Sequence, residues 1–181
     1  AGDNDPNRYG GGLHADFSAL TVSNCEFRYN KAGWGGAIFI NKSENPVISN
    51  CIIKENEATS YGGGVYLWEG VSSEISNCII TNNEATTGGG GFFLGGSVGP
   101  ANIKNCIISG NSAGSADNIY FWIRGTQQLS FINCIVWGAD SPIGYNRWGV
   151  NPEDFINCAI SNFTLTSSNS SNSISLNSTN D

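Results

Sequence analysis

The apolar residues of this chain fall into short runs of three to five positions, separated by asparagine and glycine, and the runs recur at a fixed period. The clearest marker of the period is the dipeptide Asn-Cys, which contains all the cysteines of the chain. They are Cys25, Cys51, Cys78, Cys106, Cys134 and Cys158, spaced 24 to 28 residues apart. A repeat of this length in one constant register indicates a solenoid, in which each unit buries its apolar face against its neighbours.

Each repeat contains three such runs, shown for one turn by Val47-Ile48-Ser49, Cys51-Ile52-Ile53 and Val65 to Trp68. The runs are too short for helices and are rich in β-branched and aromatic residues, which favours strands. Asparagine and glycine between them tolerate the left-handed backbone of sharp turns. The pattern therefore predicts an all-β parallel β-helix solenoid of about six rungs, with three short strands per rung.

Strand alternation predicts which residues of each rung point into the core. The cysteines should form one inward column, with asparagine side chains stacked as ladders at the turns. The residues between are then exposed, as an outward column of isoleucines: Ile52, Ile79, Ile107 and Ile135. In the strand after the glycines, we expect Leu13, Ala37, Val65, Phe92 and Ile119 to point inward. The same alignment places His14, Ile38, Tyr66, Phe93 and Tyr120 outward, together with Asp16, Ile40, Trp68 and Trp122.

Two short motifs carry a family resemblance. Gly35-Gly36-Ala37-Ile38 and Phe27-Arg28-Tyr29-Asn30 resemble the GGA(I/L/V) and FxxN repeats of polymorphic outer-membrane proteins, within the wider pectin-lyase-like class. The resemblance covers roughly residues 9–160, and only this repeat matches both motifs literally. It implies a right-handed β-helix and a secreted protein. It leaves the function open, because the class includes adhesins, passenger domains, phage spikes and polysaccharide lyases.

The chain divides into a β-helix over residues 1–160, whose first eight residues form a polar N-terminal segment, and a tail over residues 161–181. The tail is dominated by serine, asparagine and threonine and cannot build a core of its own. We expect it to lie on its own or a neighbouring β-helix through Phe163, Leu165, Ile174 and Leu176, against the isoleucine column. The chain begins Ala-Gly-Asp-Asn, which fits the processed end of a secreted protein.

Charge and cysteine usage restrict the partners. Only 13% of residues are charged, the net charge is −7, and the eight lysines and arginines are scattered, which argues against nucleic acid and anionic membranes. No apolar stretch reaches the ~20 residues of a membrane-spanning helix. The cysteine column favours free thiols, although neighbouring rungs lie close enough for disulfides. A lone histidine argues against a metal site; a calcium site at Asp3, Asp5 and Asp16 is a weak alternative.

No catalytic constellation emerges, since the outward positions Asp16, Ile40, Trp68 and Trp122 hold no carboxylate cluster. We expect a non-catalytic protein, with polysaccharide lyase or hydrolase activity as the alternative. Two functions fit: an extracellular structural subunit that stacks into a fibre or surface homo-oligomer, or an adhesin-like, carbohydrate-binding module. The second would use an outward aromatic face: Tyr66, Trp68, Phe93, Tyr120 and Trp122. Four N-x-S/T sequons, at Asn41, Asn162, Asn169 and Asn177, are candidate glycosylation sites of such a surface protein.

Overall fold

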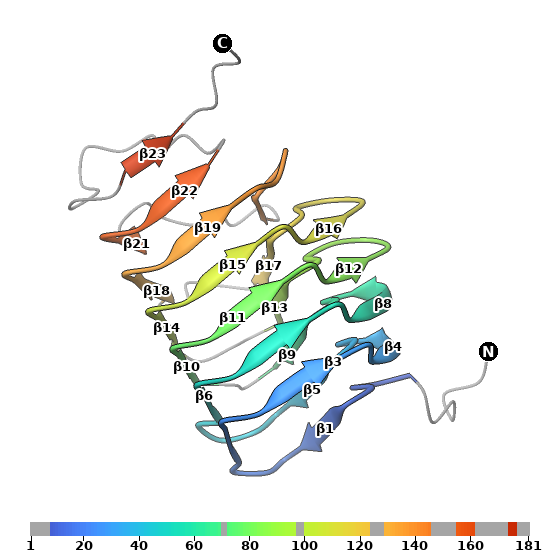
Figure 1. Ribbon diagram of the computed structural model, residues 1–181. Coiled ribbons are helices and arrows are strands. Elements are labelled where there is room, and N and C mark those ends of the chain that lie inside the picture. The colour runs from blue at the N-terminus through green and yellow to red at the C-terminus, as the bar shows by residue number, and fades with distance from the viewer. Residues whose placement is uncertain are drawn as a thin grey trace.

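The computed structural model describes residues 8–69, 72–96, 100–123, 129–145, 155–161 and 174–176. All the regular elements in these ranges are β-strands, and every strand pairing is parallel. Equivalent strands of successive turns lie side by side, as the blue-to-red layering of Figure 1 shows. The predicted parallel β-helix is therefore confirmed, and the arrangement is consistent with a right-handed one.

The strands form four sheets, which the chain visits in order from β1 to β16; the described strands after β16 belong to the first three sheets. Sheet 1 contains β1 (Leu13–Asp16), β5 (Ile38–Asn41), β9 (Val65–Trp68), β13 (Phe92–Gly96), β17 (Ile119–Ile123) and β20 (Ile143–Tyr145). Sheet 2 contains β2 (Thr21–Ser23), β6 (Val47–Ser49), β10 (Ser73–Ser76), β14 (Ala101–Lys104), β18 (Leu129–Ile132) and β21 (Phe155–Ile156). Sheet 3 contains β3 (Glu26–Arg28), β7 (Ile52–Lys54), β11 (Ile79–Thr81), β15 (Ile107–Ser109), β19 (Ile135–Trp137), β22 (Ala159–Ser161) and β23 (Ile174–Leu176). Sheet 4 contains β4 (Lys31–Trp34), β8 (Glu57–Tyr61), β12 (Glu84–Ala85) and β16 (Ser112–Ala113).

Sheet 4 is an addition to the three strands per rung that the sequence predicts. Its strands are short and mostly polar, so no apolar run marks them. Glycines form the corner between sheet 4 and sheet 1. Gly35, Gly62 and Gly89 have φ of 63° to 67° there, a left-handed conformation that glycine adopts without strain.

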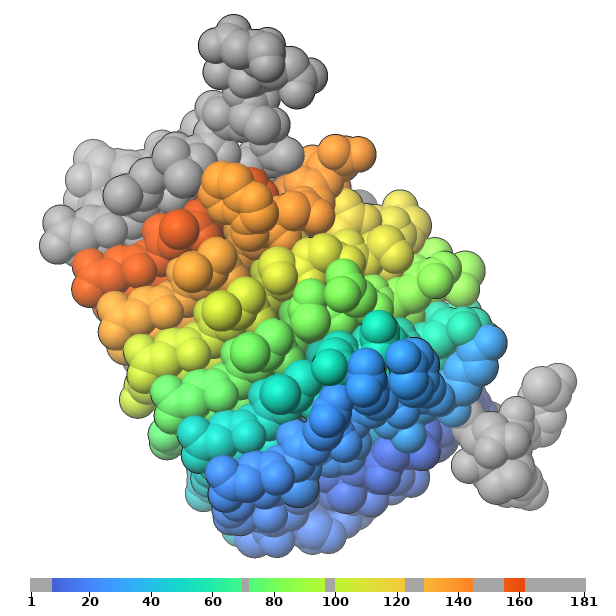
Figure 2. Space-filling model, in the orientation of Figure 1, coloured from blue at the N-terminus to red at the C-terminus, as the bar shows by residue number. Residues whose placement is uncertain are grey.

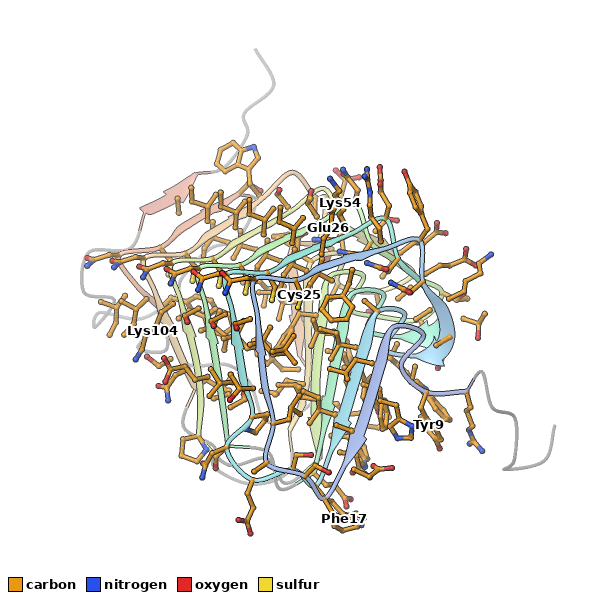
Figure 3. The ribbon with its side chains drawn as sticks, turned by 60° about the horizontal axis from the view of Figure 1, so that its bottom comes forward. Tyr9, Phe17, Cys25, Glu26, Lys54 and Lys104 are labelled. Carbon is orange, nitrogen blue, oxygen red and sulfur yellow. The ribbon has the colours of Figure 1, made fainter. Side chains whose placement is uncertain are left out.

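The Asn-Cys dipeptide forms the corner between sheets 2 and 3. All six of its asparagines have φ between 53° and 55°, the left-handed region that asparagine tolerates better than most residues. The cysteine that follows points into the core, and all six thiols are free. Cys51, Cys78 and Cys106 are each 1% exposed, in line with the paired Ile48, Ile75 and Ile103 of sheet 2, as predicted. Cys25 belongs to the first turn and is exposed (Figure 3).

A second asparagine ladder lies buried at the corner between sheets 3 and 4. Asn56 Nδ2 donates to Asn83 Oδ1 at 2.8 Å, and Asn83 Nδ2 donates to Asn111 Oδ1 at 3.0 Å. The same oxygens accept the backbone N–H groups of the preceding turn. This ladder satisfies polar backbone groups that the turn leaves without strand partners.

The predicted alignment of sheet 1 was wrong by one residue in the second turn. Leu13 pairs with Ile38, and His14 with Phe39. Ile38 and Ile40 are therefore fully buried in the core, and Phe39 and Asn41 take the outward positions. The reason is the number of glycines. Three precede Leu13 and Val65, but only two precede Ala37, which occupies the position of the third glycine.

The outward isoleucine column of sheet 3 is present. Its exposed fractions are 36% at Ile52, 40% at Ile79 and Ile107, and 43% at Ile135. This face is turned to the viewer in Figure 2, where each turn forms one band. The described part of the tail does not cross this column, because β23 pairs edge to edge with β22, with Ile174 opposite Ala159 and Leu176 opposite Ser161. β23 thus adds one strand to sheet 3 of its own chain; Phe163 and Leu165 lie outside the described residues.

Candidate functional site

The outer face of sheet 1 carries a column of aromatic rings, edge-on between His14 and Phe39 and stacked from Phe39 to Tyr120. His14, Phe39, Tyr66, Phe93 and Tyr120 occupy equivalent positions in successive strands. The ring centroids are 5.1 Å apart from Phe39 to Tyr66, 4.6 Å from Tyr66 to Phe93 and 5.7 Å from Phe93 to Tyr120. Although this face points away from the core, Phe39, Tyr66 and Phe93 are at most 7% exposed.

Three further aromatic side chains cover this column. Tyr9 lies 4.5 Å from Phe39 and stacks on Trp34, which ends β4; Tyr61, which ends β8, lies 4.8 Å from Phe93. Sheet 4 and the corner glycines thus place aromatic rings against the outer face of sheet 1, in a second apolar cluster outside the core.

The two aromatic sets, apart from Tyr120, line a groove of about 470 Å³. Figure 3 shows Tyr9 beside the start of the first strand and Phe17 beyond its other end.

A second outward column borders the groove and breaks its own repeat. In register it reads Asp16, Asn41, Trp68, Gly95 and Trp122. A Cβ added at Gly95 would lie 2.6 Å from Cζ3 and 2.7 Å from Cε3 of Trp68. The benzo edge of the Trp68 indole therefore lies against the bare backbone of Gly95, and the ring is stacked at 28° on Tyr66 and at 25° on Phe93. Trp122, two strands beyond Trp68, is 37% exposed and edges onto Tyr61 at 6.2 Å.

The first turns supply a polar end to the groove. The Asp16 carboxylate accepts a hydrogen bond from Asn41 Nδ2 at 2.8 Å and lies 2.8 Å from His14 Nε2. Lys42, which also lines the groove, has its Nζ 3.5 Å from Glu69 Oε2. The groove thus combines an aromatic floor with a small set of hydrogen-bonding groups at one end.

The hydroxyls of Tyr61 and Tyr66 stay protonated over the ordinary pH range. Burial raises the pKa of Tyr66 well above its usual value. Burial, followed by the nearby Tyr120, also raises the pKa of Tyr61. Among the residues described as lining the groove, Asp16 is the only carboxylate, whereas glycoside hydrolysis generally uses a pair.

The structure brings the five residues of the predicted aromatic face to one side of the solenoid, but not all are accessible. Tyr66 and Phe93 are 7% and 1% exposed, which leaves Trp68 and Trp122 for contact in the groove; Tyr120 is half-buried and does not line it. Sequence reasoning missed the covering rings. Their signal was present, since Tyr9, Trp34 and Tyr61 each directly precede a run of glycines.

The other predicted site residues have less support. Asn41 is half-buried, and its Nδ2, the atom a glycan would occupy, is bonded to Asp16. Asp16 is engaged by His14 and Asn41, and no group of three or more metal-ligating side chains occurs among the described residues. Asn162, Asn169 and Asn177, and the calcium candidates Asp3 and Asp5, lie outside the described residues. No described helix is long and apolar enough to cross a membrane.

Comparison with known proteins bears on the fold. Residues 4–79 match the family model described as a right handed beta helix region. Neither the search of curated proteins nor that of solved structures found a match. The match and the stacked parallel sheets together support a β-helix, and the finer resemblance to polymorphic outer-membrane proteins stays a prediction.

Proposed function

We propose that this protein is a non-catalytic, extracellular carbohydrate-binding module, and that the groove on sheet 1 holds the glycan. The observation that carries the proposal is the Trp68 indole, held between Tyr66, Phe93 and the bare backbone of Gly95 in a groove of about 470 Å³. The indole is half-buried, so part of it is open to a ligand. Trp122 adds an exposed indole in the same column.

Sugars suit such a surface because one face of a pyranose ring is made of C–H groups, while its rim carries hydroxyls. The C–H face packs on an aromatic ring, and the hydroxyls need a few well-placed donors and acceptors. Asp16 and Asn41 continue the column of Trp68, and the Asp16 carboxylate, held by Asn41 Nδ2, supplies an acceptor. Because the partners of Trp68 are already packed, little side-chain freedom is lost when a ligand binds.

The test is binding to a panel of immobilised and soluble glycans, followed by calorimetry on the best ligand. Trp68→Ala should weaken binding at least tenfold, which corresponds to about 1.4 kcal/mol. The matched control is Trp137→Ala, because Trp137 is 43% exposed on sheet 3 and does not line the groove. A protein that binds no glycan, or that binds equally well without the Trp68 indole, would refute the proposal.

A second function, that of a structural subunit in a surface assembly, is favoured by the isoleucine column of sheet 3. Four isoleucines exposed at 36% to 43% in one line form an apolar stripe of a kind that often marks interfaces. Ile79→Lys places a charge in the middle of this stripe. It should abolish concentration-dependent assembly, measured by sedimentation and electron microscopy, while the monomer stays folded. Unchanged assembly in Ile79→Lys would exclude this face as the interface.

A further inference from the structure

Resting on the proposed function, we propose that the groove binds an uncharged polysaccharide, with the sugar chain running parallel to the solenoid axis from Asp16 to Trp122. The direction of the sugar chain follows from the register of the strands in sheet 1. The absence of charge on the sugar follows from how the ionic groups around the groove are paired.

The direction is set by a column of outward residues. Asp16, Asn41, Trp68, Gly95 and Trp122 belong to five adjacent strands of sheet 1. Adjacent strands lie ~4.8 Å apart, so the column extends over roughly 19 Å. A single sugar cannot contact both ends of this column, whereas a chain of several residues can.

The two accessible indoles, Trp68 and Trp122, lie along the same column. The backbones of Trp68 and Trp122 are two strands apart, roughly 9.6 Å, and the Trp68 ring reaches the strand between them. Different sugars of one chain can therefore contact the two rings. The strand between them contributes Gly95, whose missing side chain leaves room for the Trp68 ring.

The charge class follows from the pairing of ionic groups. The Lys42 ammonium lies 3.5 Å from Glu69 Oε2, and the Arg8 guanidinium at the rim stacks 4.5 Å over the Trp34 ring. The remaining ionic group of the polar end is the Asp16 carboxylate, beside His14. An anionic sugar would have to compete with Glu69 for Lys42 and would approach Asp16.

A neutral sugar neither competes with Glu69 for Lys42 nor is repelled by the Asp16 carboxylate. A carboxylate with two lone pairs left can accept hydrogen bonds from neighbouring hydroxyls of one ring. The Asp16 carboxylate, held by Asn41 and His14, is oriented for this contact. The net charge of −7 adds a general repulsion toward polyanions.

The experiment compares two series of oligosaccharides by calorimetry with the full chain, each from two to about six sugars long. One series is neutral, consisting of β-1,4-linked glucose, mannose and xylose oligomers; the other consists of galacturonate oligomers. We expect affinity in at least one neutral series to rise with length to about four or five sugars and then level off. The galacturonate series should bind at least tenfold more weakly at every length.

Substitutions test where the oligosaccharide lies along the column from Asp16 to Trp122. Trp122→Ala should reduce the affinity for long neutral oligomers about tenfold and leave disaccharide binding on Trp68 unchanged. Asp16→Asn should lower the affinity for the neutral oligomers. It should also reduce the difference in affinity between the neutral and the galacturonate oligomers. Trp137→Ala again serves as the control, and circular dichroism verifies folding.

The outcomes separate this inference from the function on which it rests. Tighter binding of galacturonates that still depends on Trp68 would overturn the neutral class and keep the carbohydrate-binding function. Equal loss of di- and hexasaccharide binding in Trp122→Ala would overturn the proposed path. No binding in either series, or binding indifferent to Trp68, would overturn both.

Discussion

The buried asparagine ladder allows a sharp test of what stabilises the solenoid, through Asn83→Ala. Asn83 is 1% exposed. Its Oδ1 accepts from the backbone N–H of Asn56 at 3.0 Å and from Asn56 Nδ2 at 2.8 Å. Its Nδ2 donates to the Ile53 carbonyl at 2.9 Å and to Asn111 Oδ1 at 3.0 Å. Alanine removes all four hydrogen bonds.

The consequences of these losses are unequal. Asn56 Nδ2 keeps the carbonyls of Phe27 and Lys54 as acceptors, whereas the backbone N–H of Asn56 loses the acceptor it has in the structure. A buried donor without a partner costs about 1–3 kcal/mol, and each further bond about 0.5–1.5 kcal/mol. The free energy of unfolding should therefore fall by roughly 3–7 kcal/mol, a large share of the ~5–15 kcal/mol typical of a domain.

Urea unfolding followed by circular dichroism measures the global loss, and amide hydrogen exchange at Asn56 measures the local one. The control is Asn102→Ala, because Asn102 is half-buried on the outer face of sheet 2. It should change the unfolding free energy by no more than about 0.5 kcal/mol. If Asn83→Ala unfolds like the control and the Asn56 amide stays protected, the reasoning about the ladder is refuted.

Two other predictions concern the core and the aromatic cluster. Cys78→Ser should lower the free energy of unfolding by ~1–3 kcal/mol, because a hydroxyl is buried where a thiol packed. The control Cys25→Ser, at the exposed end of the cysteine column, should change this free energy by less than ~0.5 kcal/mol. Equal effects of the two substitutions would contradict the burial of the column. Burial raises the pKa of Tyr66, so its contribution to stability is complete below the tyrosine pKa of the unfolded chain, about 10, and is lost as pH rises toward the higher folded value. Tyr66→Phe should therefore flatten the fall in stability above about pH 10 in alkaline unfolding curves, and an unchanged fall would assign it to other groups.

Sheets 2 and 3 could be predicted from the sequence because their signals are strict. Each Asn-Cys corner fixes the next inward residue, so the alternation from Ile52 to Ile53 has one solution with the cysteine inside. Sheet 1 is different because the glycine run before it varies in length, and a shift of one residue exchanges the two faces of a strand. Ile38 was assigned to the surface for that reason.

The groove was beyond prediction for a second physical reason. Alternation tells which side of a strand a ring occupies, but not what lies on that side. Phe93 is outward by alternation and still only 1% exposed, because Tyr61 from sheet 4 lies on it. Sheet 4 depends on backbone pairing between polar segments such as Glu57–Tyr61, which have no hydrophobic period to detect.

In a solenoid, the residues that recur in every turn are explained by the fold. A residue that departs from the repeat therefore needs another explanation, such as function. Gly95 breaks the outward column between two tryptophans, and a Cβ there would lie 2.5 Å from Cε1 of Phe93 and 2.6 Å from Cζ3 of Trp68. Both the Trp68 indole and the Phe93 ring, which is buried under Tyr61, have to shift in Gly95→Ala. We expect this substitution to weaken glycan binding about as much as Trp68→Ala, and to lower stability as well because the buried Phe93 ring is displaced. The double variant should then bind no more weakly than Trp68→Ala alone, since both changes remove the same platform. Calorimetry on the single and double variants measures this coupling, and additive losses would show that Gly95 serves the ligand by some route other than the Trp68 ring.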